Sequence, residues 1–213
     1  LPMQRFIRCF PAILAVFAVL QLLAAPAMAQ PPAPDRLGGL TLGESAEKAG
    51  ALLALKSAQA VEEAPWLTRI GVAPDDIFKS GYVMTGRCFA KGRILRIKLK
   101  YREDDLPFFR KLIGALLERY GNPSQYKGDL EGEVMGNKWS FTNANGESIS
   151  LIVQRAQNGD PDVSQGVVIK LANQTLMEAE RSCYEYARGG KTGGAPAPRT
   201  ASPGGDIEGY LPR

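Results

Sequence analysis

The clearest pattern of hydrophobic and polar positions in the chain is an alternation over residues 93–102. Apolar side chains occupy one set of positions and basic side chains the other: Leu95, Ile97, Leu99 and Tyr101 against Arg96, Lys98, Lys100 and Arg102. A period of two residues is typical of a half-buried β-strand. We therefore predict a hairpin in which strand 82–89 and strand 93–102 are joined by a turn at Lys91-Gly92.

The pattern changes to a helical period directly after this strand. Asp105 is suited to cap a helix, Pro107 is tolerated in a first turn, and Gly121-Asn122-Pro123 would end it. The apolar positions that recur at helical spacing are Leu106, Phe109, Leu112, Ile113, Leu116, Leu117 and Tyr120. This segment is the strongest helix prediction in the sequence.

Weaker patterns complete the predicted fold. Ser45 is expected to cap a helix that runs to about Lys56, residues 57–80 are expected to be irregular, and a closing helix is expected over 174–187. Further strands are predicted at 138–143, 148–155 and 166–172. The order α-ββ-α-βββ-α indicates an α+β fold, an antiparallel sheet of about five strands with helices packed on one face.

Both ends of the chain differ from this central part. Arg5 and Arg8, the apolar run 10–25 and the triplet Ala27-Met28-Ala29 form the three parts of a secretory signal peptide, predicted to be residues 1–29. Residues 30–36 read as a proline-rich linker, 37–187 as the α+β domain, and 188–213 as a disordered tail rich in glycine and proline. We expect a periplasmic or secreted protein with no stable transmembrane span once the signal is removed, because the apolar run is shorter than the ~20 residues that cross a bilayer.

Charge and composition narrow the function classes. The chain has 213 residues, a formal net charge of +4 and no histidine, which excludes Ser-His and Cys-His catalysis and histidine-ligated metal sites. The excess positive charge comes from the two ends, so residues 30–187 are formally neutral. A nucleic-acid partner is therefore not expected.

The segment Gly39-Leu40-Thr41-Leu42-Gly43-Glu44-Ser45, followed by a short predicted helix, is similar to the opening of some small exported bacterial domains. Together with the hairpin and the helix that ends at Tyr120-Gly121-Asn122-Pro123, it resembles outer-membrane assembly lipoproteins of the SmpA/OmlA type and β-lactamase-inhibitor-like domains. The resemblance covers roughly residues 38–55 and 90–123, and its motifs are structural. It implies a binding or accessory role in the envelope and transfers no functional residue, and the chain lacks the lipidation cysteine of those lipoproteins.

Two short motifs match catalytic signatures. Ser45-Ala46-Glu47-Lys48 fits S-x-x-K and Lys191-Thr192-Gly193 fits K-T-G, the order found in penicillin-binding enzymes. No S-D-N triplet lies between them, and Ser45 is explained as a helix cap. We therefore predict no catalytic residues, no cofactor and no metal, and a binding or accessory protein of the cell envelope that is not an enzyme. The alternative is an envelope enzyme that uses carboxylates alone, such as a glycan hydrolase.

The basic strand gives the most specific functional hypothesis. Residues 77–102 contain no acidic residue, and Arg96, Lys98, Lys100 and Arg102 would form a row about 20 Å long on one face. Arg87 on the preceding strand is expected to face Arg96. These five residues are candidates for binding an anionic lipid or lipopolysaccharide surface or an envelope protein. The alternative is a solvated outer face whose charges prevent edge-to-edge aggregation of strands.

The cysteine count predicts a disulfide. Removal of residues 1–29 would remove Cys9 and leave Cys88 and Cys183, an even number in an oxidising compartment. Cys88 is expected on the inward face of its strand and Cys183 on the apolar stripe of the closing helix. We therefore predict a Cys88–Cys183 bridge, with two separate buried thiols as the alternative.

Overall fold

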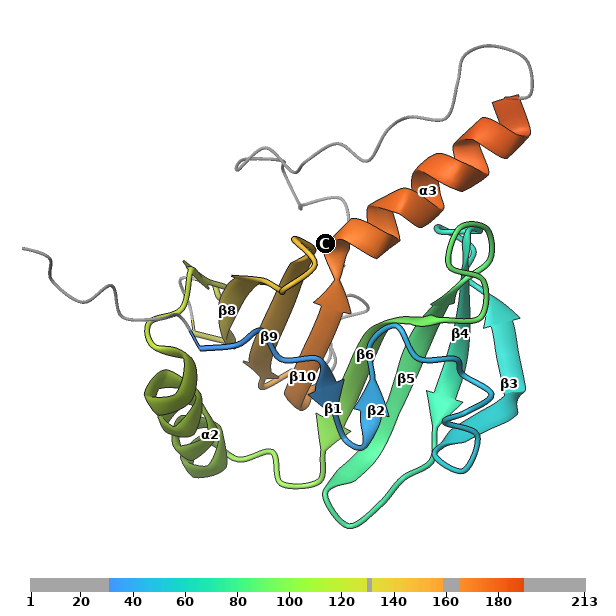
Figure 1. Cartoon of the computed structure of the whole chain (residues 1–213). Coiled ribbons are helices and arrows are strands. Elements are labelled where there is room, and N and C mark those ends of the chain that lie inside the picture. The colour runs from blue at the N-terminus through green and yellow to red at the C-terminus, as the bar shows by residue number, and fades with distance from the viewer. Residues whose placement is uncertain (1–30, 130–131, 159–164, 190–213) are drawn as a thin grey trace, which may run out of the picture. The chain divides into compact units, whose positions relative to one another are not determined.

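The computed structural model describes residues 31–129, 132–158 and 165–189. The predicted signal peptide, and the predicted tail beyond Gly189, lie outside these residues. Within them the chain is mainly β-structure (Figure 1). None of the helices in this part of the chain combines the length and the apolar composition that crossing a bilayer requires.

One antiparallel sheet dominates the described residues. It has eight strands in the order β3-β4-β5-β6-β10-β9-β8-β7. Their bounds are β3 Leu53–Ala60, β4 Leu67–Val72, β5 Phe78–Gly86, β6 Ile94–Tyr101, β7 Gln125–Tyr126, β8 Val134–Thr142, β9 Ser148–Ala156 and β10 Gly166–Asn173. Two short strands, β1 (Arg36–Leu37) and β2 (Leu40–Thr41), form a separate hairpin.

The first face of the sheet carries the main core. One cross-strand row runs from β4 to β8 through Ile70, Val83, Ile97, Leu171, Leu151 and Trp139, all of them buried. Phe109 of helix α2 (Leu106–Tyr120) and Leu40 of β2 belong to the same apolar cluster. Helix α2 and the β1–β2 hairpin therefore cover this face (Figure 1).

The second face carries a smaller apolar cluster at one end. Leu67, Leu95 and Ala172 pack there with Met177 of helix α3 (Gln174–Gly189). Figure 1 shows α3 continuing from the end of β10. Because Ala172 and Leu171 point to opposite sides of β10, the clusters of α2 and α3 lie on opposite faces of the sheet.

The predicted fold class is wrong in two respects. The sheet has eight strands and not about five, and its helices do not share a face. The helix predicted from Ser45 is absent: Ser45 forms an isolated antiparallel bridge with Arg93, residues 46–50 form turns, and β3 begins at Leu53. Residues 57–80, predicted to be irregular, contain the end of β3, all of β4 and the start of β5.

Strand β3 forms although its residues favour a helix. Its sequence, LALKSAQA, is composed mostly of helix formers, but pairing with β4 overrides that preference. The register shifts between Ala54 and Gln59, and Ser57 holds this bulge. Ser57 Oγ donates a hydrogen bond to the carbonyl of Ala54 (2.7 Å) and accepts one from the backbone N–H of Gly71 (2.8 Å). A bulge on an edge strand also discourages pairing with another molecule.

Candidate functional site

Basic side chains gather on the second face of the sheet, beside the cluster under α3. In register, Tyr82 of β5 lies opposite Lys98 of β6, Lys98 opposite Lys170 of β10, Lys170 opposite Ile152, and Ile152 opposite Lys138 of β8. Arg96 and Lys100 flank Lys98 on the same side of β6, and Arg69 of β4 pairs with Met84 on the same side. We call Arg69, Arg96, Lys98, Lys100 and Lys170 the basic face.

Neutral groups position several of these cations. The guanidinium carbon of Arg69 lies 4.2 Å from the ring centre of Tyr82, and Lys98 Nζ lies 5.5 Å from the same centre. Lys170 Nζ donates a hydrogen bond to Gln154 Oε1 (2.7 Å), and Arg96 Nη1 lies 3.9 Å from the sulfur of Met84. An aromatic ring, an amide oxygen and a thioether orient a cation without cancelling its charge.

Burial is the first cause of the lowered lysine pKa values on the face, and neighbouring positive charges add to it, although Asp104 acts in the opposite direction on Lys100. Burial lowers the pKa of Lys170 to about 7, and the positive charges of Lys98 and Arg96 contribute in the same direction. Burial also lowers the pKa of Lys98, with further contributions from Arg69, Arg96 and Lys100. Like charges placed opposite each other on adjacent strands are destabilising. Protonation of both Lys98 and Lys170 in the folded protein is therefore costly.

The structure brings three of the five predicted basic residues together. Arg96, Lys98 and Lys100 share the basic face, whereas Arg87 lies past the end of β5 and donates from Nη1 to the carbonyl of Pro65 (2.7 Å). Arg96 is opposite Met84 and not Arg87. Arg102 follows β6 and donates from Nε to the carbonyl of Asp75 (2.5 Å).

Two members of the face were missed from the sequence. Arg69 lies in the segment predicted to be irregular, and Lys170 is a single lysine within the apolar strand 166–172. The sequence alone could have singled out Lys170, because a lysine in the middle of an apolar strand is unusual. It could not have shown that Lys98 lies opposite Lys170, because this contact depends on the pairing of β10 with β6.

The position of β6 argues against one explanation of its charges. A basic row on an edge strand discourages aggregation, but β6 is an inner strand, paired with β5 on one side and β10 on the other. Its Arg96, Lys98 and Lys100 are only half-exposed. Protection of a sheet edge therefore does not account for them.

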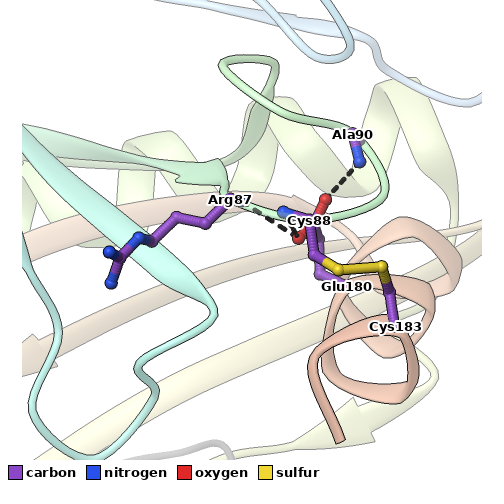
Figure 2. Close-up of a disulfide and its surroundings, with 5 residues drawn as sticks. All are labelled: Arg87, Cys88, Ala90, Glu180 and Cys183. Carbon is purple, nitrogen blue, oxygen red and sulfur yellow. Dashed lines mark hydrogen bonds between the residues drawn. A yellow bond between two sulfur atoms is a disulfide. The ribbon is translucent and has the colours of Figure 1, made fainter. Parts of the chain in front are cut away.

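The predicted pair Cys88–Cys183 is a disulfide in the structure, with Cα atoms 5.9 Å apart (Figure 2). Cys88 lies in the loop between β5 and β6 and not on the strand as predicted. Beside it, the fully buried Glu180 of α3 accepts hydrogen bonds from the backbone N–H groups of Arg87 (3.0 Å), Cys88 (2.7 Å) and Ala90. The loop is thus fixed to α3 by a covalent bond and by a carboxylate.

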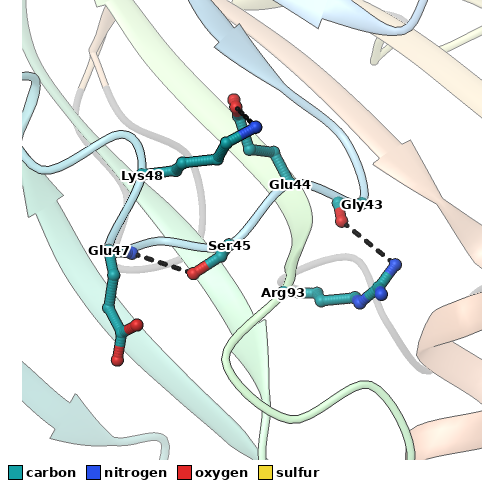
Figure 3. A network of polar contacts seen from close by, with 6 residues as sticks. All are labelled: Gly43, Glu44, Ser45, Glu47, Lys48 and Arg93. Carbon is teal, nitrogen blue, oxygen red and sulfur yellow. Dashed lines mark hydrogen bonds and ion pairs between the residues drawn. The ribbon is translucent and has the colours of Figure 1, made fainter.

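The S-x-x-K motif forms a turn next to the same loop (Figure 3). Ser45 Oγ accepts a hydrogen bond from the backbone N–H of Glu47 (3.3 Å), and Lys48 Nζ pairs with Glu44 (3.6 Å). Arg93 Nη1 donates to the carbonyl of Gly43 (3.5 Å), which ties the turn to the loop. These contacts give Ser45 and Lys48 local structural partners, although Ser45 caps a turn and not the predicted helix. The K-T-G triplet lies outside the described residues.

No family model, curated protein or solved structure matches this chain. Among residues 31–129, 132–158 and 165–189, no three histidine, cysteine or carboxylate side chains are grouped so that they could hold a metal ion.

Proposed function

We propose that this chain is an exported binding protein of the cell envelope that holds anionic groups on its basic face and has an accessory, non-catalytic role. The observation that carries the proposal is the direct opposition of Lys98 and Lys170 on two inner strands, with Arg96 beside them. This arrangement lowers the stability of the folded protein. Groups that reduce stability in this way are found at functional sites. An anion between the two ammonium groups would remove the cost.

The depth of the face favours a compact anionic group. Lys98 and Lys170 are half-buried, and Arg69 is exposed at the rim. A phosphate group could enter far enough to contact both lysines while the arginine binds a second oxygen. Phosphates of this kind occur on lipid headgroups and as free ions.

The proposed location rests on two supports. The first thirty residues have the layout of a secretory signal, and a structural disulfide suits an oxidising compartment. Fractionation of cells that express the full chain, followed by N-terminal sequencing, tests this part. We expect the protein in the periplasmic or secreted fraction with Gln30 as its first residue, and a cytoplasmic chain with an intact N-terminus would contradict it.

Binding to vesicles and to free phosphate tests the site. We expect the mature protein to associate with phosphatidylglycerol vesicles, or with inorganic phosphate, at low salt. The association should weaken as salt shortens the screening length to about 8–10 Å. Vesicles of phosphatidylcholine distinguish an anionic headgroup from a general lipid affinity, and calorimetry with phosphate alone identifies a free-ion ligand.

Matched charge reversals provide the control. The double variant R96E/K98E should lose binding, whereas R110E/K111E, which makes the same charge change on exposed positions of α2, should keep most of it. Equal losses in both variants, or no binding of either ligand by the wild type at low salt, would show that the face is only a solvated surface.

A further inference from the structure

A separate cavity of about 520 Å³ lies where the loops at one end of the sheet meet. Its walls come from residues 33–35 and 42–43, the β5–β6 loop, the β8–β9 turn and the start of α3. This volume is within the range of small-molecule sites, which often lie between loops held on a rigid scaffold. None of the five residues of the basic face lines it.

Hydrogen bonds fix the polar groups of the cavity. Glu147 Oε2 accepts from Asn143 Nδ2 (2.7 Å) and from Asn173 Nδ2 (3.1 Å). Asn143 Oδ1 accepts in turn from the backbone N–H groups of Asn145 (3.0 Å) and Glu147 (2.9 Å), and Asn173 Oδ1 from that of Leu176 (3.0 Å). A carboxylate has about four acceptor positions, so Glu147 retains capacity for hydroxyl groups of a ligand.

An exposed aromatic side chain stands at the same cavity. Phe89 lines it with 65% of its surface exposed. Its neighbours in sequence are held firmly, because Cys88 forms the disulfide with Cys183 and Ala90 donates its backbone N–H to Glu180 (Figure 2). A loop fixed in this way presents the ring without a large entropic cost on binding.

The mixture of groups selects the chemistry of the ligand. The carboxylates of Asp35 and Glu147 disfavour an anionic ligand. The guanidinium of Arg93, which can only donate hydrogen bonds, disfavours a cationic one. The carboxylates, the amide of Asn145 and the guanidinium together suit a neutral molecule with many hydroxyl groups. The exposed ring of Phe89 suits the apolar C–H face of a sugar.

We propose that this cavity binds a neutral oligosaccharide, with Phe89 stacked on one sugar ring and Glu147, Asn145 and Arg93 hydrogen-bonded to its hydroxyl groups. The site is independent of the basic face, and its ligand need not be the anionic one.

Calorimetry of the disulfide-bonded mature protein with chitotetraose, cellotetraose and maltotetraose tests the proposal. We expect at least one of these to bind, with Phe89→Ala and Asn145→Ala each weakening affinity about tenfold. Phe89→Trp should retain binding. Tyr126→Ala removes another exposed aromatic ring (58% exposed) outside the cavity and should have no effect.

Four outcomes would overturn the proposal: no binding of any of the three sugars, an equal loss in Tyr126→Ala, tighter binding of an anionic oligogalacturonate than of the neutral sugars, or release of new reducing ends that Glu147→Gln abolishes. The last would indicate a hydrolase in place of a binding site. The variant R96E/K98E should bind the sugar normally, which keeps this test separate from that of the basic face.

Discussion

Glu180 shows how a single buried carboxylate organises a loop. It has no exposed surface and accepts three backbone N–H groups from residues 87–90. Replacement by glutamine leaves one oxygen for these donors and directs an NH₂ group toward at least one of them. We therefore expect Glu180→Gln to lower the free energy of unfolding by about 2–3 kcal/mol.

Urea unfolding measures this loss, and Glu185→Gln on the exposed side of α3 is the control. That change should cost less than about 0.5 kcal/mol, because it affects a surface ion pair with Arg181. Equal stabilities of Glu180→Gln and the wild type would show that the three N–H groups do not depend on the carboxylate.

Lys170 illustrates the opposite case, a residue that reduces stability. Its pKa in the folded protein is about 7, below the ordinary value of 10.5. Between these values the unfolded chain binds a proton that the folded chain does not, so wild-type stability should rise with pH from 7 toward 10. Lys170→Met should remove much of this rise and should be more stable than the wild type at pH 6, by about 1–3 kcal/mol.

The free energy of unfolding, measured at pH 6 and pH 9 for the wild type and Lys170→Met, gives both the pH dependence and the stability gain of the variant. Besides burial, which is the largest cause, the charged groups that lower the pKa of Lys170 are Lys98 and Arg96. Lys98 has a lowered pKa of its own, so some pH dependence should remain in the variant. Lys111→Met on exposed α2 is the control and should leave the pH dependence unchanged. A variant that is less stable than the wild type at pH 6 would refute the assignment of Lys170 as a destabilising group.

At the scale of elements, local signals were predictable and distant pairing was not. Helix α2 begins as predicted, with Asp105 Oδ1 accepting from the N–H of Phe108 (2.7 Å), and ends at Gly121 with φ of 73°. Both features depend on residues a few positions apart. Strand β3 was missed because its conformation depends on pairing with β4: residues 53–56 were predicted as the end of a helix and residues 57–60 as irregular. The basic face was found only in part for the same reason.

The disulfide is an element-scale feature whose two partners were both predicted correctly from the sequence. It closes a loop of 95 residues and joins the β5–β6 loop to α3. We expect Cys88→Ser/Cys183→Ser to lose about 2–5 kcal/mol of stability, with the chain-entropy limit near the upper value. Mass spectrometry after alkylation of the denatured, non-reduced protein should find both cysteines protected, and two labelled thiols would contradict the bridge.

Over the whole described molecule, the sheet consists of two four-stranded antiparallel units. Strands β3–β6 follow one another from one edge to the centre, helix α2 leads to the other edge, and strands β7–β10 return to the centre, where β6 pairs with β10. Lys98 and Lys170 meet at this seam. The two units therefore join at the place where their charges repel, which makes the basic face a property of the assembled sheet and of neither unit alone.

This arrangement predicts how salt affects the entire fold. The ion pairs Glu44–Lys48, Lys79–Asp104 and Glu178–Arg181 are all at least partly exposed and contribute little stability, so screening should act mainly on the repulsion within the basic face. Raising NaCl from about 10 mM, where the screening length is ~30 Å, to about 1 M, where it is ~3 Å, should raise the melting temperature.

Phosphate at equal ionic strength should raise the melting temperature further, because an ion that binds the folded state stabilises it by mass action. The additional effect of phosphate should disappear in R96E/K98E and persist in R110E/K111E. A melting temperature that falls with NaCl, or an equal response of both variants to phosphate, would contradict a repulsive basic face at the centre of the sheet.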